Sequence, residues 1–150
     1  MTHGTRHTTA VGRLGDLNPK LKRFGCHIRL QVPATLPPFD EPEPDGAIVK
    51  GDDKRYVDRH PGAGDVLCVI EVADASLRRD RGYKQGIYAD SGVAQYIIIN
   101  LPDDVVEVYT QPIRGKGRYG QVETLSAKQV VSFNVGRGKT LKSPVRRLLP

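Results

Sequence analysis

Two carboxylates and one amine are the residues of this chain best suited to metal-assisted chemistry. Asp45 stands where a proline-rich segment gives way to a short apolar run, and Glu71 follows the continuous apolar run 66–70. Carboxylate oxygens are ligands for hard divalent cations, and neighbouring strands could bring these two side chains together. The backbone carbonyl of Val72 would be a further ligand. Lys84 could stabilise charge on a phosphate or orient an attacking water.

The same residues also have a purely structural interpretation. Glu71 could be a strand-end carboxylate that is ion-paired with Lys84. Asp45 and Glu71 are 26 positions apart, a separation that is ordinary for two acids. Spacing alone therefore favours the ion pair over a metal site.

Strand patterns surround these positions. Apolar residues alternate with polar ones over residues 26–32, which predicts a strand with one buried face. The five prolines of residues 33–44 exclude regular structure and predict an extended connection to Asp45. The β-branched run 94–100 and the alternating run 105–109 flank a Pro-Asp-Asp turn and predict a hairpin.

Two helices are predicted. Residues 7–23 carry apolar side chains at spacings of three and four, but Pro19 should end or kink this helix near Asn18. Residues 78–91 form the second, which ends at a Ser-Gly pair. Residues spaced four apart share one face of this helix: Asp80, Lys84 and Tyr88.

The order of these elements predicts the fold class. Weaker strand patterns follow at residues 118–125 and 129–135, in a part of the chain that glycines punctuate. Strands that outnumber helices in this order favour an α/β (α+β) fold with a mixed sheet. A length of 150 residues suits one domain spanning residues 1–150.

Composition narrows the class of protein. With 38% hydrophobic and 27% charged residues, the chain is unlike a disordered one. No apolar run approaches the roughly 20 residues of a membrane span, and the start lacks the apolar stretch of a signal peptide. We therefore expect a cytoplasmic protein with no membrane partner. Cys26 and Cys68 lie in apolar segments without metal-ligand spacing, so buried thiols are favoured over a disulfide.

Charge and the remaining polar residues are less specific. A net charge of +6 favours an anionic partner such as nucleic acid, although it would equally serve solubility. His7, His27 and His60 have no metal-ligand spacing and are expected to be structural or exposed. Tyrosines 83, 88 and 96 are expected to be core aromatics with one polar end.

Four blocks of the sequence carry a further signal: Glu41-Pro-Glu-Pro-Asp45, Val69-Ile-Glu-Val-Ala-Asp-Ala-Ser76, Asp80-Arg-Gly-Tyr-Lys84 with Tyr88, and Gly92-Val-Ala-Gln-Tyr96. Together they resemble the Uma2 restriction endonuclease family of the PD-(D/E)XK nuclease superfamily. They occur in the family's order between about residues 41 and 110, and the opening Gly4-Thr-Arg-His7 is similar too. The combination is far more specific than any single block.

This resemblance implies a restriction endonuclease-like core, a mixed sheet flanked by helices, that hydrolyses phosphodiester bonds in DNA with Mg²⁺ or Mn²⁺. Asp45 matches the family's Pro-Asp aspartate, Glu71 its strand glutamate and Lys84 its helix lysine. Ala73 stands where the wider superfamily has a lysine, so Lys84 would have to replace that cation. Arg6 stands where an acidic residue is common in the family.

Three functions remain open from the sequence. The resemblance favours a metal-dependent nuclease. A nuclease-derived domain could instead bind nucleic acid without cutting it, with Glu71 and Lys84 as a structural ion pair. A third possibility is an interaction module that forms a homodimer through the edge of its sheet.

Overall fold

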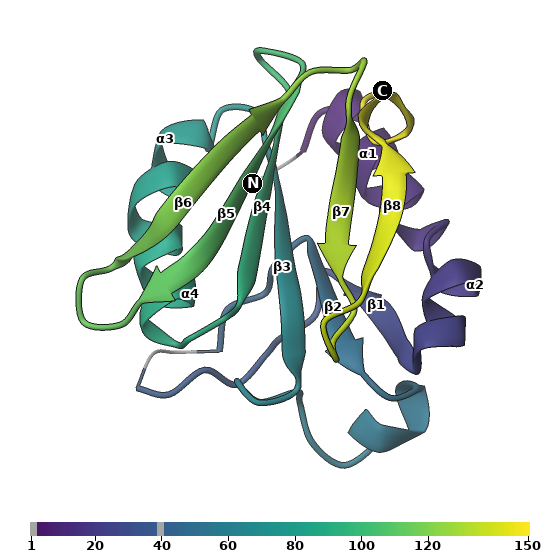
Figure 1. The fold of residues 1–150 in the computed structure, drawn as a ribbon, viewed down its shortest axis with the longest axis vertical. Coiled ribbons are helices and arrows are strands. Elements are labelled where there is room, and N and C mark those ends of the chain that lie inside the picture. Colours follow the sequence, from purple (N-terminus) through teal and green to yellow (C-terminus); the bar gives the residue numbers. More distant parts are fainter. Residues whose placement is uncertain (1–2, 39–40) are drawn as a thin grey trace.

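A mixed six-stranded sheet and a two-stranded sheet organise the protein (Figure 1). The computed structural model describes residues 3–38 and 41–150. In the larger sheet the strand order follows the chain from β1 to β6. The β3–β4 pair is parallel and the other pairs are antiparallel. The strands are β1 (Cys26–Leu30), β2 (Gly46–Lys50), β3 (Val66–Ala73), β4 (Gln95–Asn100), β5 (Val105–Ile113), β6 (Arg118–Leu125), β7 (Val130–Asn134) and β8 (Thr140–Pro144).

Helices cover both faces of the larger sheet. The first set, α1 to η1, precedes β1. The second set, α3 to α4, connects β3 to β4. These two strands are parallel, and neighbouring parallel strands need such a crossover connection. Figure 1 shows α3 and α4 on the side of β4 to β6, and α1 on the other side with β7 and β8. The helical segments are α1 (Thr5–Gly15), α2 (Asn18–Leu21), η1 (Lys22–Phe24), η2 (Asp53–Tyr56), α3 (Leu77–Arg79), the π-helix η3 (Asp80–Lys84), α4 (Gln85–Asp90) and η4 (Val145–Arg147).

Alternation along β3 divides the core into two clusters. Ile70 and Val72 pack with α1 and the β7–β8 hairpin. Val69 and Ala73 pack on the opposite face with the tyrosines of α4 and β4. Since successive side chains of a strand point to opposite faces, Glu71 lies on the face covered by α4. The buried acid is thereby placed under the helix that follows it.

The architecture confirms the fold class predicted from the sequence, a mixed sheet flanked by helices. The predicted break in the first helix is also present, because α1 ends at Gly15 and α2 restarts at Asn18. Pro19 occupies the first turn of α2, where a missing N–H removes no helical hydrogen bond. Both cysteines are buried and free, as expected.

Three sequence predictions are corrected, and one strand was missed. Tyr83 was expected in the core but is 64% exposed. Glu71 does not end its strand, because β3 continues to Ala73. The helix expected at residues 78–91 is divided by the π-helix η3. The strand β8 was not predicted, because its five residues hold a single large apolar side chain, Leu141, and show no two-residue apolar period; it is paired with β7.

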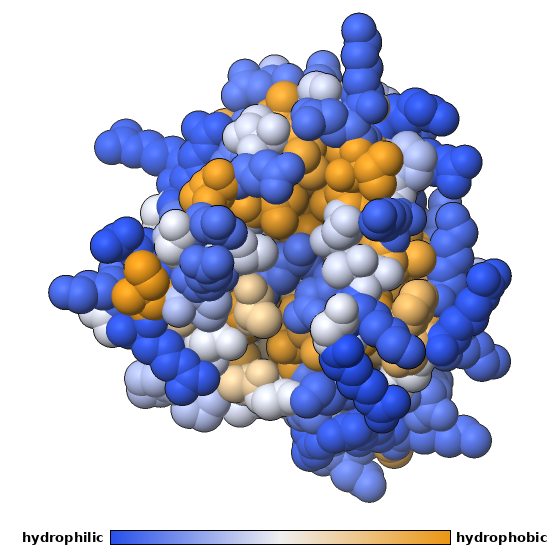
Figure 2. All heavy atoms as spheres, viewed as in Figure 1, coloured by the Kyte–Doolittle hydropathy of each residue, from blue (hydrophilic) through white to orange (hydrophobic). Residues whose placement is uncertain are grey.

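Hydrophilic side chains cover most of the periphery in Figure 2, while apolar side chains reach the surface in the middle of the same face. Among the helices of the described residues, none has the length and hydrophobicity needed to cross a bilayer.

Candidate active site

Glu71 is the buried centre of the candidate site. Its side chain projects from β3, an inner strand of the larger sheet, and the residue is 1% exposed. Oε1 accepts a hydrogen bond from the main-chain N–H of Asp45 at 3.1 Å. Oε2 accepts one from the Tyr88 hydroxyl at 2.9 Å. Both oxygens of the carboxylate are thus held by the protein.

Asp45 lies one residue before β2, where the β2–β3 ladder ends. The last paired residues are Gly46 and Ile70, so the backbone groups just before Gly46 and just after Ile70 need other partners on this side. The Asp45 N–H donates to Glu71, and the Val72 N–H donates to Asp45 Oδ2 at 2.8 Å. These reciprocal side-chain to backbone bonds extend the pairing of the two strands and bring the two carboxylates together.

A histidine of α1 completes the surroundings of Asp45. His7 Nε2 lies 3.2 Å from Asp45 Oδ2, and the His7 side chain is buried. Its other ring nitrogen, Nδ1, is buried without a hydrogen-bond partner among the described residues. The first helix therefore contributes a polar group to this site.

Lys84 approaches Glu71 from the helical segment above the sheet. Its Nζ lies 3.1 Å from Glu71 Oε2 and 3.2 Å from Asp80 Oδ1. Asp80 is fixed in turn, since Ser76 Oγ donates to its Oδ2 and the Tyr96 hydroxyl donates to its main-chain oxygen, both at 2.9 Å. Asp80 and Lys84 begin and end η3, and π-helical segments of this kind are frequent at functional sites.

The electrostatics of this cluster follow from its burial. Desolvation raises the pKa of Glu71 to about 7, and the positive charge of Lys84 opposes this rise. Burial likewise raises the pKa of Asp80. Desolvation lowers the pKa of Lys84, but the carboxylates of Glu71 and Asp80 outweigh it and the net shift is upward. The positive charge of Lys84 therefore favours the ionised form of both carboxylates, in opposition to their burial.

The donor atoms present suit a hard cation. In the described part of the chain, no three His, Cys, Asp or Glu side chains are grouped as a metal site. Asp45 and Glu71 supply two carboxylates. The Val72 N–H points toward β2 and bonds Asp45, whereas the Ala73 carbonyl points toward β4. Since the N–H and C=O of one strand residue point to the same side and the next residue's point to the other, the Val72 carbonyl also faces β2. Mg²⁺ commonly uses one or two carboxylates and keeps several waters. Two carboxylates and one carbonyl fit that requirement.

A cavity of about 500 Å³ opens beside Glu71, while Asp45 and Val72 are not among its lining residues. Glu71 and Lys84 line it together, so the buried ion pair can be approached from the surface. Tyr83 stands at its edge, is 64% exposed, and lies under the guanidinium of Arg79. The other lining residues are Pro38, Glu41, Pro42, Glu43, Ile87 and Tyr88.

The structure brings Asp45, Glu71 and Lys84 together, and it also forms the Glu71–Lys84 ion pair of the structural interpretation. Asp80 and His7 were not predicted as members of the cluster. The four-residue spacing of Asp80 from Lys84 was a signal that could have found the first. His7 lies in the opening block that resembles the family, but no sequence pattern indicated its contact with Asp45, which spans 38 positions.

Comparisons with known proteins concern the family and the fold of the chain. The family model described as "Uma2: Putative restriction endonuclease" matches residues 1–140. No curated protein matches the chain. A solved structure from Anabaena variabilis ATCC 29413, described as a putative nuclease belonging to DUF820, is similar with a TM-score of 0.63 and 12% identity. The match covers 99% of this chain and 82% of that one, and at this identity it shows a shared fold.

Proposed function

Because the chain belongs to the Uma2 family of putative restriction endonucleases, we propose that it is a metal-dependent nuclease that hydrolyses phosphodiester bonds in DNA. The observation that carries the proposal is the approach of Lys84 Nζ to Glu71 Oε2, 3.1 Å, in the wall of an open cavity. Asp45, Glu71 and Lys84 are the proposed catalytic residues. An isolated ion pair would need no access from the surface.

Asp45, Glu71 and the Val72 carbonyl are the groups proposed to hold the metal ion. Restriction endonuclease-like families generally use divalent metal ions, and we assign Mg²⁺ or Mn²⁺ because all three donors are oxygens. When bound, such an ion lowers the pKa of a coordinated water and stabilises charge on a phosphate. It would also favour the ionised form of Glu71, whose pKa burial raises to about 7.

The protein's own groups have separate roles in this proposal. Lys84 remains protonated, because the carboxylates of Glu71 and Asp80 raise its pKa, and its ammonium offers positive charge to the phosphate. Asp80 orients Lys84 and is itself held by Ser76. Tyr88 holds Glu71 through a 2.9 Å hydrogen bond. Such preorganisation costs no rearrangement at the moment of reaction.

One observation favours a second function. Both oxygens of Glu71 already accept protein hydrogen bonds, and Lys84 is shared between two carboxylates. A nuclease-derived domain that binds nucleic acid without cutting it would need no free ligand positions at Glu71. This alternative predicts salt-sensitive binding without hydrolysis.

Cleavage of DNA by the purified protein separates the two functions. Supercoiled plasmid and a labelled duplex are incubated with Mg²⁺, with Mn²⁺, or with a chelator. Metal-dependent cleavage that disappears in Glu71→Gln, while that variant keeps the wild-type melting temperature, supports the nuclease. Binding without cleavage under either metal supports the second function and contradicts the first.

A further inference from the structure

A second cavity, of about 620 Å³, lies among three turns of the chain. The first turn joins η1 to β1, the second follows β2, and the third joins β7 to β8. Figure 1 shows the β7–β8 turn descending toward the end of the sheet where β1 begins. The lining residues are Arg23, Phe24, Gly25, Cys26, Lys50, Gly51, Arg55, Leu67, Val135, Gly136, Arg137 and Lys139.

The lining of this cavity is cationic. Five of its side chains are Lys or Arg, and none of the lining residues is acidic. Arg55 is paired with Asp65, but the other four form no ion pair within the described residues. Cations gathered from three separate turns raise one another's electrostatic energy unless an anion joins them. The four unpaired cations are Arg23, Lys50, Arg137 and Lys139.

Glycines keep the cavity open between these cations. Gly25, Gly51 and Gly136 have backbone φ angles of 71°, 80° and 85°, a region that residues other than glycine rarely adopt. The Gly51 N–H donates to the Gly25 oxygen at 2.7 Å, which fixes two of the three turns against each other. The cationic side chains thus surround a space bordered by bare backbone.

This cavity is separate from the candidate active site. Leu67 in its wall lies four residues before Glu71 in β3, which places the two about 13 Å apart along the strand. The β2–β3 register shifts between Ile48 and Val49, which leaves Leu67 unpaired in this ladder. The Leu67 side chain packs in the core cluster that also contains the apolar residues of α1. Glu71 lies on the opposite face, under Tyr88. A phosphate bound beside Glu71 cannot reach the second cavity, because the sheet lies between them.

We propose that this second cavity is a binding site for phosphate-bearing anions. Arg and Lys are the side chains that bind phosphate oxygens most strongly, the first through two parallel hydrogen bonds. The phosphates could belong to a nucleic-acid strand that wraps around the β7–β8 turn, or to a free polyphosphate such as a nucleotide. Both sources offer the same chemistry to Arg23, Lys50, Arg137 and Lys139.

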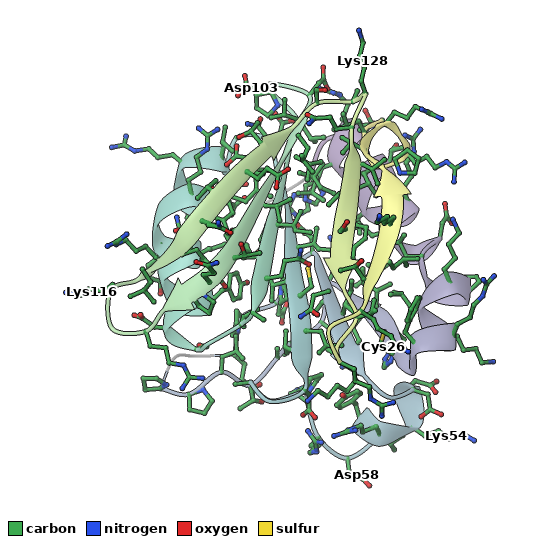
Figure 3. All side chains as sticks on the ribbon, in the orientation of Figure 1. Cys26, Lys54, Asp58, Asp103, Lys116 and Lys128 are labelled. Atoms are coloured by element: carbon green, nitrogen blue, oxygen red, sulfur yellow. The ribbon has the colours of Figure 1, made fainter. Side chains whose placement is uncertain are left out.

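A pair of charge-reversal variants tests the proposal against the general effect of net charge. Arg137→Glu/Lys139→Glu removes two cations from the cavity. Lys116→Glu/Lys128→Glu makes the same change in exposed turns, and Figure 3 shows both of these lysines far from Cys26, which lines the cavity. Each reversal removes two charge units, so either double variant lowers the net charge from +6 to +2.

Two probes distinguish the sources of phosphate. Fluorescence anisotropy follows a labelled single-stranded oligothymidylate in the presence of a chelator, so that no metal-dependent cleavage occurs. Calorimetry follows inorganic tripolyphosphate. We expect the cavity variant to weaken binding of at least one probe by about tenfold or more, and the control pair to weaken it less than about threefold. Binding of the oligonucleotide alone assigns a strand, and binding of tripolyphosphate assigns a free polyphosphate.

Three results would overturn the proposal. The first is binding of neither probe by the wild-type protein, and the second is an equal loss in both double variants. The third is loss of the same binding in Glu71→Gln, which would assign the phosphate to the candidate active site instead. Melting temperatures of all variants show that each one is folded. Because the chelator abolishes metal-dependent cleavage, failure of the nuclease proposal would leave this result unaffected.

Discussion

Lys84 Nζ lies 3.1 Å from Glu71 Oε2, although the two residues belong to a helical segment and a central strand. Ala73, two residues after Glu71, faces the same side of β3 and is fully buried. A lysine at position 73 would have to enter that packed cluster. The π-helix η3 instead brings the ammonium of Lys84 to Glu71 from the helical segment that follows β3.

Replacing Lys84 tests its proposed catalytic role. We expect Lys84→Gln to lower the rate of DNA cleavage by about 10²- to 10³-fold, because the positive charge offered to the phosphate is lost. The rate is measured on plasmid at saturating Mg²⁺. Lys116→Gln removes an exposed lysine elsewhere and should leave the rate unchanged. A Lys84→Gln enzyme that cleaves at the wild-type rate would assign Lys84 a structural role.

Metal binding should be visible without any measurement of activity. At a metal concentration about tenfold above Kd, binding stabilises the folded state by about 1.4 kcal/mol, which raises Tm by about 4 °C for a chain of this length. Asp45→Asn should abolish the shift in Tm with Mg²⁺ or Mn²⁺. Asp58→Asn, in an exposed loop labelled in Figure 3, is the matched control and should keep it. An undiminished shift in Asp45→Asn would place the metal elsewhere.

The hydroxyl of Tyr88 holds Glu71 in place. Tyr88→Phe removes one buried hydrogen bond and keeps the ring that packs 5.0 Å from Tyr96. We expect the free energy of unfolding to fall by about 1 kcal/mol in urea denaturation. Tyr83→Phe changes an exposed ring and should stay within about 0.5 kcal/mol of the wild type. Equal effects of the two substitutions would contradict the role assigned to Tyr88.

Glu107, a buried carboxylate of β5, gives a pH-dependent prediction. Burial alone would raise the pKa of Glu107, but hydrogen bonds from Arg81, Tyr109 and Asn100 hold it below its usual value. A depressed pKa stabilises the folded state above the unfolded-state pKa, and this contribution disappears as the pH falls through the folded-state pKa.

Glu107→Gln should therefore cost about 1–2 kcal/mol near neutral pH, a figure reduced by the partial exposure of Arg81. The difference from the wild type should shrink as the pH falls below 4.5, the unperturbed pKa of this carboxyl. Chemical denaturation of both proteins between about pH 7 and pH 3 measures it. A difference that stays constant or grows in acid would show that the carboxylate charge is not what stabilises this contact.

The sequence by itself determined the elements and much of the candidate site. Continuous apolar runs specified β3 and β4, Pro19 specified the break after α1, and these signals depend on residues close together in the chain. The four-residue spacing of Asp80 and Lys84 placed both on one helical face. The resemblance then indicated which carboxylates to consider.

Only the tertiary structure decided how those residues meet. The reciprocal bonds between Asp45 and the Glu71–Val72 segment depend on the register of β2 against β3, which packing and the strand ends fix. The contact of His7 with Asp45 depends on where α1 docks. The phosphate-binding cavity draws its cations from three turns far apart in the chain. Local periodicity carries no information about such contacts, because their free energy arises only after distant segments have packed together.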